Sequence, residues 1–286
     1  MNKGIRRKCE HINISINVID NNTLNASAVK LDDIDYMMTF NHGIWACIDD
    51  LYKENHNFFE KKLQTLNTFK KDGIYLNHFF EHFILTFLFG HELGHIIRSH
   101  HDLGKKSDTI NENQIIDLNL NIFNSTTLLK DKNNLRFLIE SDADASAGLI
   151  IASAIKQQYS NLITINNIVN KQNLFIDLIK YTTYSIYMIT NEFNYSYSKD
   201  SNYPMPFLRF AIIQGHIAIQ LDKYKILSQK EMEKIFIESL FEIYTYLEKN
   251  NKNYNAYNSK DLINIIEIKY KEMKELNQII SKYKFC

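Results

Sequence analysis

Over most of the chain, apolar side chains recur every three or four positions, which is the spacing typical of amphipathic helices. This pattern predicts helices over 76–101, 134–158, 162–193 and, in several pieces, 206–283. Only eight Gly and two Pro occur in 286 residues, so few residues would break long helices. The hydrophobic pattern therefore predicts a mainly α fold.

The N-terminal part follows a different pattern. Residues 12–29 contain two short runs that alternate apolar and polar side chains, separated by a polar turn, and the second run covers 24–29. Such alternation is typical of half-buried strands, and it predicts a small β-hairpin over 12–29. Asp32 and Asp33 come next and are good helix N-caps, so they predict a helix that continues through Tyr52.

No repeat and no clear linker divides the chain. A polar, Asn-rich stretch at 104–132 is typical of a surface loop, and the heavily charged residues 259–283 indicate a solvated amphipathic helix. We therefore expect residues 1–286 to form a single domain, mainly α, with a small N-terminal β-hairpin.

Composition narrows the possible partners and surroundings. Lys plus Arg and Asp plus Glu both number 33, so a net charge of zero argues against nucleic acid or an anionic membrane as main partner. Cys9, Cys47 and Cys286 form no CxxC pair, which indicates reduced thiols in a cytoplasmic protein. The N-terminus lacks the apolar run of a secretory signal, and the apolar segment 79–97 carries too many ionisable groups for a membrane span.

The most specific motif is HExxH, formed by residues 91–95 within the predicted helix 76–101. On a helix, positions i and i+4 share one face, so His91 and His95 can reach a single zinc ion. Glu92 lies to the side, where it can act as the general base toward the attacking water. Ile84, Leu88 and the two histidines continue one apolar stripe, which predicts that the imidazoles face the interior. Two core histidines without a metal are the alternative.

A zinc site needs a third protein ligand, and the first candidate is His101. It stands where the metzincin pattern HExxHxxGxxH has its last histidine. That pattern turns the chain at a glycine, whereas this chain has Arg98 at that position. Met205 could supply a Met-turn, but a lone Met is more typical of core packing. The metzincin alternative is therefore the weaker one.

Glu140 is the second candidate. Glu140 and Asp144 are four residues apart in a predicted helix, so one carboxylate can bind a metal while the other supports a ligand. The small and apolar residues that follow favour close helix packing. The alternative is an acidic, solvated helix face to which Asp142 also contributes.

These motifs resemble those of the gluzincin peptidases, which combine HExxH with ExxAD. In length and spacing the chain is most similar to the Lit-type phage-exclusion peptidases, and more distantly to the HtpX and CAAX-prenyl proteases. The matching pieces frame most of the chain, although only the two zinc motifs are specific: Asp35 to Trp45, His91 to His95, Glu140 to Asp144, and Tyr203-Pro204 with Arg209.

The resemblance implies a zincin-like helical metallopeptidase domain with zinc on His91, His95 and Glu140. It also implies that Glu92 is the base and that Asp144 accepts a hydrogen bond from the first zinc histidine. One segment departs from these families, which usually read HPxxxxR there: Tyr203 stands in place of the histidine. A phenol can still donate one hydrogen bond to a developing oxyanion, or it can be an ordinary loop residue.

Arg209 ends the same segment, and either an ion pair with Asp144 or a surface position is consistent with the sequence. The leading functional hypothesis is a cytoplasmic zinc endopeptidase with one or a few protein targets. The Lit resemblance implies phage defence through cleavage of elongation factor Tu. A regulator- or repressor-cleaving peptidase and a catalytically silent binding protein of the same fold are the alternatives, and the intact Glu92 argues against the silent protein.

Overall fold

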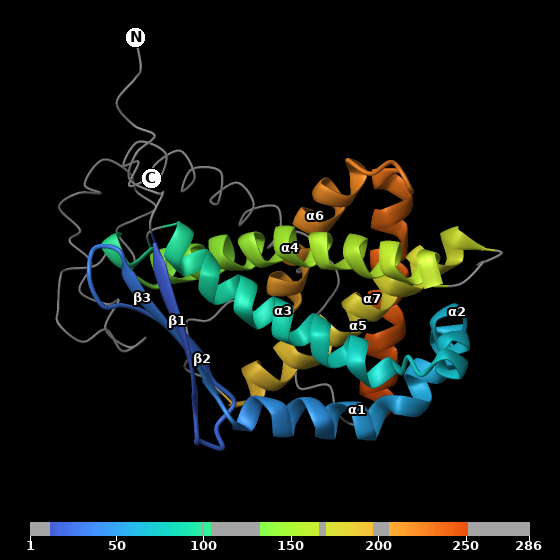
Figure 1. The fold of residues 1–286 in the computed structure, drawn as a ribbon, viewed down its shortest axis with the longest axis horizontal. Coiled ribbons are helices and arrows are strands. Elements are labelled where there is room, and N and C mark those ends of the chain that lie inside the picture. The colour runs from blue at the N-terminus through green and yellow to red at the C-terminus, as the bar shows by residue number, and fades with distance from the viewer. Residues whose placement is uncertain (1–11, 99, 104–131, 166–169, 197–205, 251–286) are drawn as a thin grey trace, which may run out of the picture.

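The protein is described from a computed structural model that covers residues 12–98, 100–103, 132–165, 170–196 and 206–250. These residues are mainly helical, with a three-stranded sheet near the N-terminus (Figure 1), so the predicted mainly α class is confirmed. The strands are β1 (Asn13–Ile19), β2 (Ala26–Lys30) and β3 (Asp35–Asn41). The helices are α1 (Gly43–Lys62), α2 (Gln64–Asn67), η1 (Thr68–Asp72), α3 (Leu76–Ile97), η2 (His100–Leu103), α4 (Lys132–Ile165), α5 (Lys171–Ser196), α6 (Pro206–Asp222) and α7 (Gln229–Lys249).

Two of the helices predicted after residue 75 need correction, and a third lies outside the described residues. The predicted helix 162–193 is divided, because α4 continues to Ile165 and α5 begins at Lys171. The helix predicted over 76–101 ends at Ile97, and a short 3₁₀ turn follows. The predicted helix over 259–283, and the predicted loop 104–132 except Lys132, lie outside the described residues.

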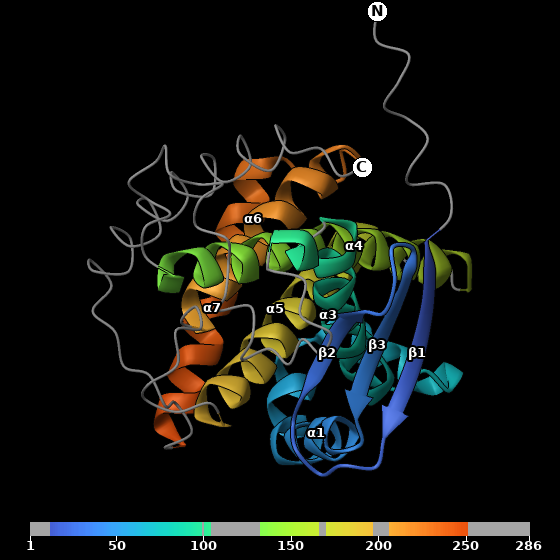
Figure 2. The same ribbon diagram turned by 90° about the vertical axis from the view of Figure 1, so that its left-hand side faces the viewer.

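The predicted β-hairpin over 12–29 is wrong. β1 and β2 do not pair with each other; β3 lies between them, parallel to β1 and antiparallel to β2 (Figure 2). The tight connection is instead between β2 and β3, where the backbone N–H groups of Leu31 and Asp32 both donate to the carbonyl of Asp35. The two aspartates that had suggested an N-cap therefore form the turn of this hairpin.

β3 occupies a segment that had been predicted as helix. Tyr36, Met38 and Phe40 alternate along it and are buried against the helices, at 5%, 0% and 6% exposure. Helix α1 starts only at Gly43, where a side chain would meet the carbonyl of Asn22 at 2.3 Å. The sequence hid this strand, because Met37 is apolar where an alternating pattern needs a polar residue, and the polar Thr39 and Asn41 are buried as well.

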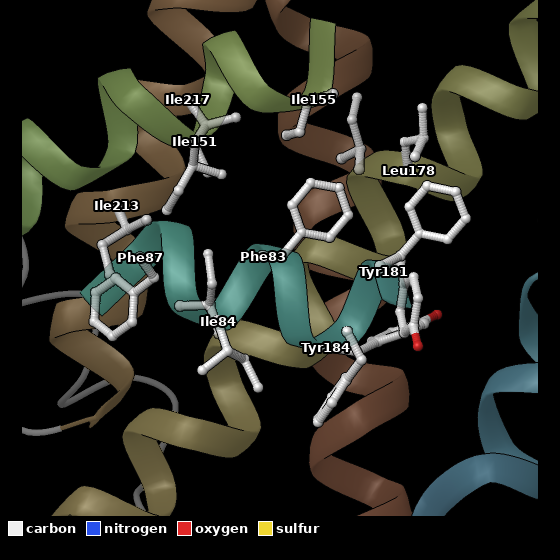
Figure 3. Packing of buried hydrophobic residues seen from close by; sticks show 14 of the residues in the cluster. Phe83, Ile84, Phe87, Ile151, Ile155, Leu178, Tyr181, Tyr184, Ile213 and Ile217 are labelled. Atoms are coloured by element: carbon white, nitrogen blue, oxygen red, sulfur yellow. The ribbon is translucent and has the colours of Figure 1, made fainter. Parts of the chain in front are cut away.

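Helix α3 lies at the centre of the helical layer and packs against α1, α4 and α5. Its apolar stripe is fully buried, and Figure 3 shows how side chains of four helices meet around it. The labelled side chains are Phe83, Ile84 and Phe87 of α3, Ile151 and Ile155 of α4, Leu178, Tyr181 and Tyr184 of α5, and Ile213 and Ile217 of α6. This core fixes the rotation of α3 about its axis, and thereby the direction of side chains further along the same stripe.

Small residues bring α3 and α4 unusually close. A Cβ atom added at Gly94 would lie 2.9 Å from the Cα of Ala143 and 3.0 Å from the Cβ of Ser146. One turn earlier, a Cβ at Gly90 would lie 3.0 Å from the Cα of Ala147. The two helices therefore meet nearly backbone to backbone, at the level of His91 and His95. This contact explains the small residues that follow Glu140 in the sequence.

Gly94→Ala should destabilise the protein, because the new methyl group forces α3 and α4 apart. Overpacking of this kind typically costs about 1–3 kcal/mol. Gly215→Ala is the matched control, since a Cβ there has no atom within 4 Å and only the helix propensity changes. Urea unfolding of both variants measures the difference. Equal stability changes in the two variants would show that the helices can separate without cost.

Candidate metal centre

The buried stripe of α3 ends in two histidines, and their Nε2 atoms face each other. His91 and His95 are 7% and 8% exposed, and their Nε2 atoms lie 3.2 Å apart. His91 stands one helical turn beyond Phe87, which belongs to the same apolar face, and His95 stands two turns beyond it. The helix therefore directs both imidazoles into the interior, as the sequence pattern had predicted.

Helix α4 adds Glu140 to this pair. One carboxylate oxygen lies 3.2 Å from His91 Nε2, and the other lies 3.9 Å from His95 Nε2. Ligand atoms of the three residues all lie within 4.8 Å of one another, and the three are buried. Within the described part of the chain, His91, His95 and Glu140 thus form a group that can hold a metal ion.

The donor set and its spacing fit zinc. Two histidine nitrogens bound at about 2.0–2.1 Å to one tetrahedral ion lie about 3.3 Å apart. The observed separation of the two Nε2 atoms is 3.2 Å. Two imidazoles and one carboxylate are also a donor set that catalytic zinc sites use, with the fourth position left for water or substrate.

Asp144 holds His91 from the opposite side of the ring. Its Oδ1 atom lies 2.8 Å from His91 Nδ1, and it is fully buried. Arg209 of α6 donates two hydrogen bonds to this carboxylate, from Nε and Nη2, both of 2.9 Å. The Arg209 guanidinium also lies 5.6 Å from the ring centre of Phe87. The ion pair with Asp144, one of the two alternatives for Arg209, is thus the one present, and it fixes the orientation of the His91 ring.

The mutual contacts decide which of these groups carry charge. Burial by itself lowers the pKa of His91, but hydrogen bonds to Asp144 and Glu140 outweigh it and raise that pKa to about 10. Burial dominates at His95 and holds its pKa well below the ordinary value. The pKa values of Glu140 and Asp144 are lowered in spite of burial, Glu140 chiefly by the His91 hydrogen bond and Asp144 chiefly by Arg209. A metal ion would therefore replace a proton on His91.

Three residues around His95 were not recognised as parts of the site. His100, in η2, is 2% exposed, and its Nδ1 atom lies 3.0 Å from Nδ1 of His95. Its Nε2 atom lies 3.0 Å from Oδ2 of Asp142, which Arg98 also contacts at 2.7 Å. Asp142 is therefore buried and paired, and the acidic solvated face considered from the sequence is wrong. The sequence did contain a signal for these residues, since Asp142 is a third acid within an otherwise small and apolar helical segment. A buried acid needs cationic or hydrogen-bonding partners, so it pointed to neighbours such as His100 and Arg98.

The remaining candidates have different positions. Glu92 is 5% exposed and lies on α3 between the two histidines. His101 is not part of the metal-binding group formed by the described residues, and its ring centre lies 6.5 Å from that of His95. Tyr203 and Met205 lie outside the described residues. The ligand geometry therefore favours Glu140 over His101.

One edge of the sheet has outward-facing backbone groups. Asn25 and Leu31, which flank β2, make backbone hydrogen bonds with β3, so the odd-numbered residues of β2 are the hydrogen-bonded positions. The N–H groups of Ala26 and Ala28 therefore point away from β3. Because β2 is an outer strand of the three described ones, these groups have no partner strand in the sheet.

The sheet approaches the metal helix at one end. Helix α3 packs chiefly against β2 among the strands. The ring of Tyr36 lies 5.9 Å from that of His101, and Tyr36 stands opposite Lys30 in the β2–β3 register. The Lys30 end of β2 is therefore near the end of α3 that carries His95.

Comparison with known proteins adds no identification. No protein-family profile, no curated protein and no solved structure matches this chain. None of the helices in the described part of the chain combines the length and the apolar content needed to cross a bilayer.

Proposed function

We propose that this chain is a zinc-dependent endopeptidase. The observation that carries the proposal is the convergence of His91, His95 and Glu140 on one buried point, next to Glu92 of the same HExxH sequence. This combination of two imidazoles, one carboxylate ligand and an adjacent carboxylate base is what hydrolysis of a peptide bond with zinc requires.

Each residue has a separate task in this proposal. Bound zinc supplies Lewis-acid chemistry, since it makes a water molecule more acidic and polarises a carbonyl group. Glu92 takes a proton from the attacking water and later gives it to the leaving amine. Asp144 and Arg209 hold the His91 ring so that its Nε2 lone pair points toward Glu140 and His95. Tyr203 remains a candidate donor to the developing oxyanion.

The identity of the substrate is proposed from the resemblance. Similarity to the Lit-type peptidases supports a zincin-like domain, a cytoplasmic location and a role in phage defence. Elongation factor Tu is accordingly the first protein to test as substrate. The charge balance of the chain supports a protein substrate over nucleic acid.

Cleavage can be tested without knowing the target. We expect N-terminal proteomic mapping in cells that express the protein to reveal new protein N-termini in one or a few proteins. Cells that express the Glu92→Gln variant should lack these termini, because only the base differs. Identical sets of termini from the two proteins, both at wild-type abundance and zinc content, would overturn the endopeptidase proposal.

The outer edge of β2 is the proposed binding strand for an extended substrate, because the outward N–H groups of Ala26 and Ala28 can pair with a peptide backbone. Ala28→Pro should therefore reduce cleavage and leave zinc bound, since it removes an outward N–H without touching the β2–β3 ladder. Val29→Pro is the contrasting variant, because it removes a ladder hydrogen bond and should lower stability as well. Assays of cleavage, zinc content and unfolding distinguish the two. Full cleavage by Ala28→Pro would exclude β2 as the binding edge.

A further inference from the structure

The two zinc-binding histidines are supported from their far nitrogens in different ways. His91 contacts a carboxylate directly, through Asp144. The far nitrogen of His95 contacts a second imidazole instead, that of His100, and only this ring reaches a carboxylate, that of Asp142. The two arrangements otherwise correspond, because each carboxylate also pairs with an arginine.

Helix geometry explains why an intervening ring is needed. Glu140 and Asp144 are four residues apart and share one face of α4, so both can reach His91. Asp142 is two residues from each, about 200° around the helix, and so faces another direction. The ring of His100, in the turn after α3, spans the distance between this carboxylate and His95.

The distances permit one consistent placement of protons. If Nε2 of His95 faces the metal, its Nδ1 atom carries the hydrogen and donates to Nδ1 of His100, 3.0 Å away. His100 then carries its own hydrogen on Nε2 and donates it to Oδ2 of Asp142, also 3.0 Å away. Both imidazoles are neutral in this arrangement, and every ring nitrogen has a partner.

Arg98 completes the arrangement. Its Nε and Nη2 atoms donate to the two oxygens of Asp142 at 2.7 and 3.2 Å. Arg98 is part-exposed, with 32% of its side chain accessible, whereas the Asp142 side chain is 6% accessible. Arg98 therefore neutralises the Asp142 carboxylate from the solvent side, and the Oδ2 atom of Asp142 can still accept a hydrogen bond from His100.

We propose that His100 and Asp142 are positioning residues of the metal site, which together fix the tautomer and the ring orientation of His95. This inference rests on the proposed zinc site. It extends that site by a His95–His100–Asp142 relay, in which neither His100 nor Asp142 touches the metal or the substrate. Hydrogen-bond partners of this kind typically contribute 10- to 100-fold to metal affinity.

The test compares His100→Phe and His100→Gln with wild type. Phenylalanine keeps a planar ring but has no acceptor for the His95 hydrogen, so zinc affinity should fall about 10- to 100-fold. Glutamine offers a carbonyl oxygen and should restore part of the loss. His82→Phe is the matched control on α3, since His82 is half-buried and lies well away from the site along the helix. Zinc affinity is measured by competition with a chelator.

A spectroscopic measurement separates positioning from general stability. In zinc-loaded wild type, side-chain ¹H–¹⁵N NMR should show the His95 hydrogen on Nδ1. In His100→Phe this signal should shift or exchange with water, and the visible spectrum of the cobalt-substituted protein should change. Should His100→Phe fail to fold, Asp142→Leu provides the same test, because leucine has a similar size but no oxygen to accept the His100 hydrogen, and Arg98 is part-exposed to water.

The outcomes distinguish this inference from the proposed function. A folded His100→Phe or Asp142→Leu variant with wild-type zinc affinity and an unchanged cobalt spectrum overturns the relay while the zinc site stands. Wild-type protein that binds no zinc overturns the metal site, and the relay with it.

Discussion

Glu92→Gln should abolish peptide-bond cleavage while fold and zinc affinity remain those of wild type. Glutamine has the shape of glutamate, so the packing of this buried side chain is retained, but its amide cannot accept the proton of the attacking water. Loss of a general base typically lowers the rate by about 10²- to 10⁴-fold. The measurement is turnover by purified protein on a substrate identified by N-terminal mapping, at saturating zinc.

His91→Ala provides the comparison for this experiment, because it should lose the metal together with the activity. Zinc analysis of both purified variants then separates loss of the base from loss of the metal. A Glu92→Gln variant with near wild-type turnover would show that another group accepts the proton. The assignment of Glu92 would then fail, while the metal ligands would be unaffected.

Arg209→Met should destabilise the metal-free protein by about 3–5 kcal/mol, the typical cost when one partner of a buried ion pair is removed. Asp144 has no exposed surface, and both of its oxygens accept hydrogen bonds from Arg209. Without the guanidinium, the carboxylate remains charged and buried beside His91. The free energy of unfolding in urea, measured with chelator present, gives the effect.

Two further variants make this measurement specific. The double variant Asp144→Asn/Arg209→Met should be more stable than Arg209→Met alone, because the asparagine carries no charge and its carbonyl oxygen still accepts from His91. Lys234→Met removes an exposed ion pair with Glu238 and should change stability by about 1 kcal/mol or less. A cost for Arg209→Met as small as that of Lys234→Met would mean that water or another cation reaches Asp144.

The architecture explains how the chain keeps so many ionisable groups buried. Gly90 and Gly94 allow α4 to approach α3 closely enough for its acids to contact the histidines directly. Glu140, Asp142 and Asp144 each have a cationic or imidazole partner, which offsets the cost of removing them from water. The small residues after Glu140 and the acids within them thus serve one purpose, which is to complete the site across the contact of two helices.

The sequence alone determined the long helices and the central ligand group. The 3.6-residue period depends only on local spacing, so the core helices α3 and α4 were predicted close to their observed positions. The same period implies that His91 and His95 share a face, and that Glu140 and Asp144 share another. Their chemistry limited the possible partners, and the structure places the groups within reach of one another.

Tertiary structure decided what local spacing does not specify. β3 is a strand because it is paired on both sides and packed against the helices, whereas the two aspartates before it, Asp32 and Asp33, and its mixed pattern favoured a helix locally. The relay from His95 through His100 to Asp142 joins residues more than forty positions apart, and its existence depends on how closely α3 and α4 pack. Periodicity fixes the direction of a side chain relative to its own helix. Only the packing of the helices fixes which side chain it meets.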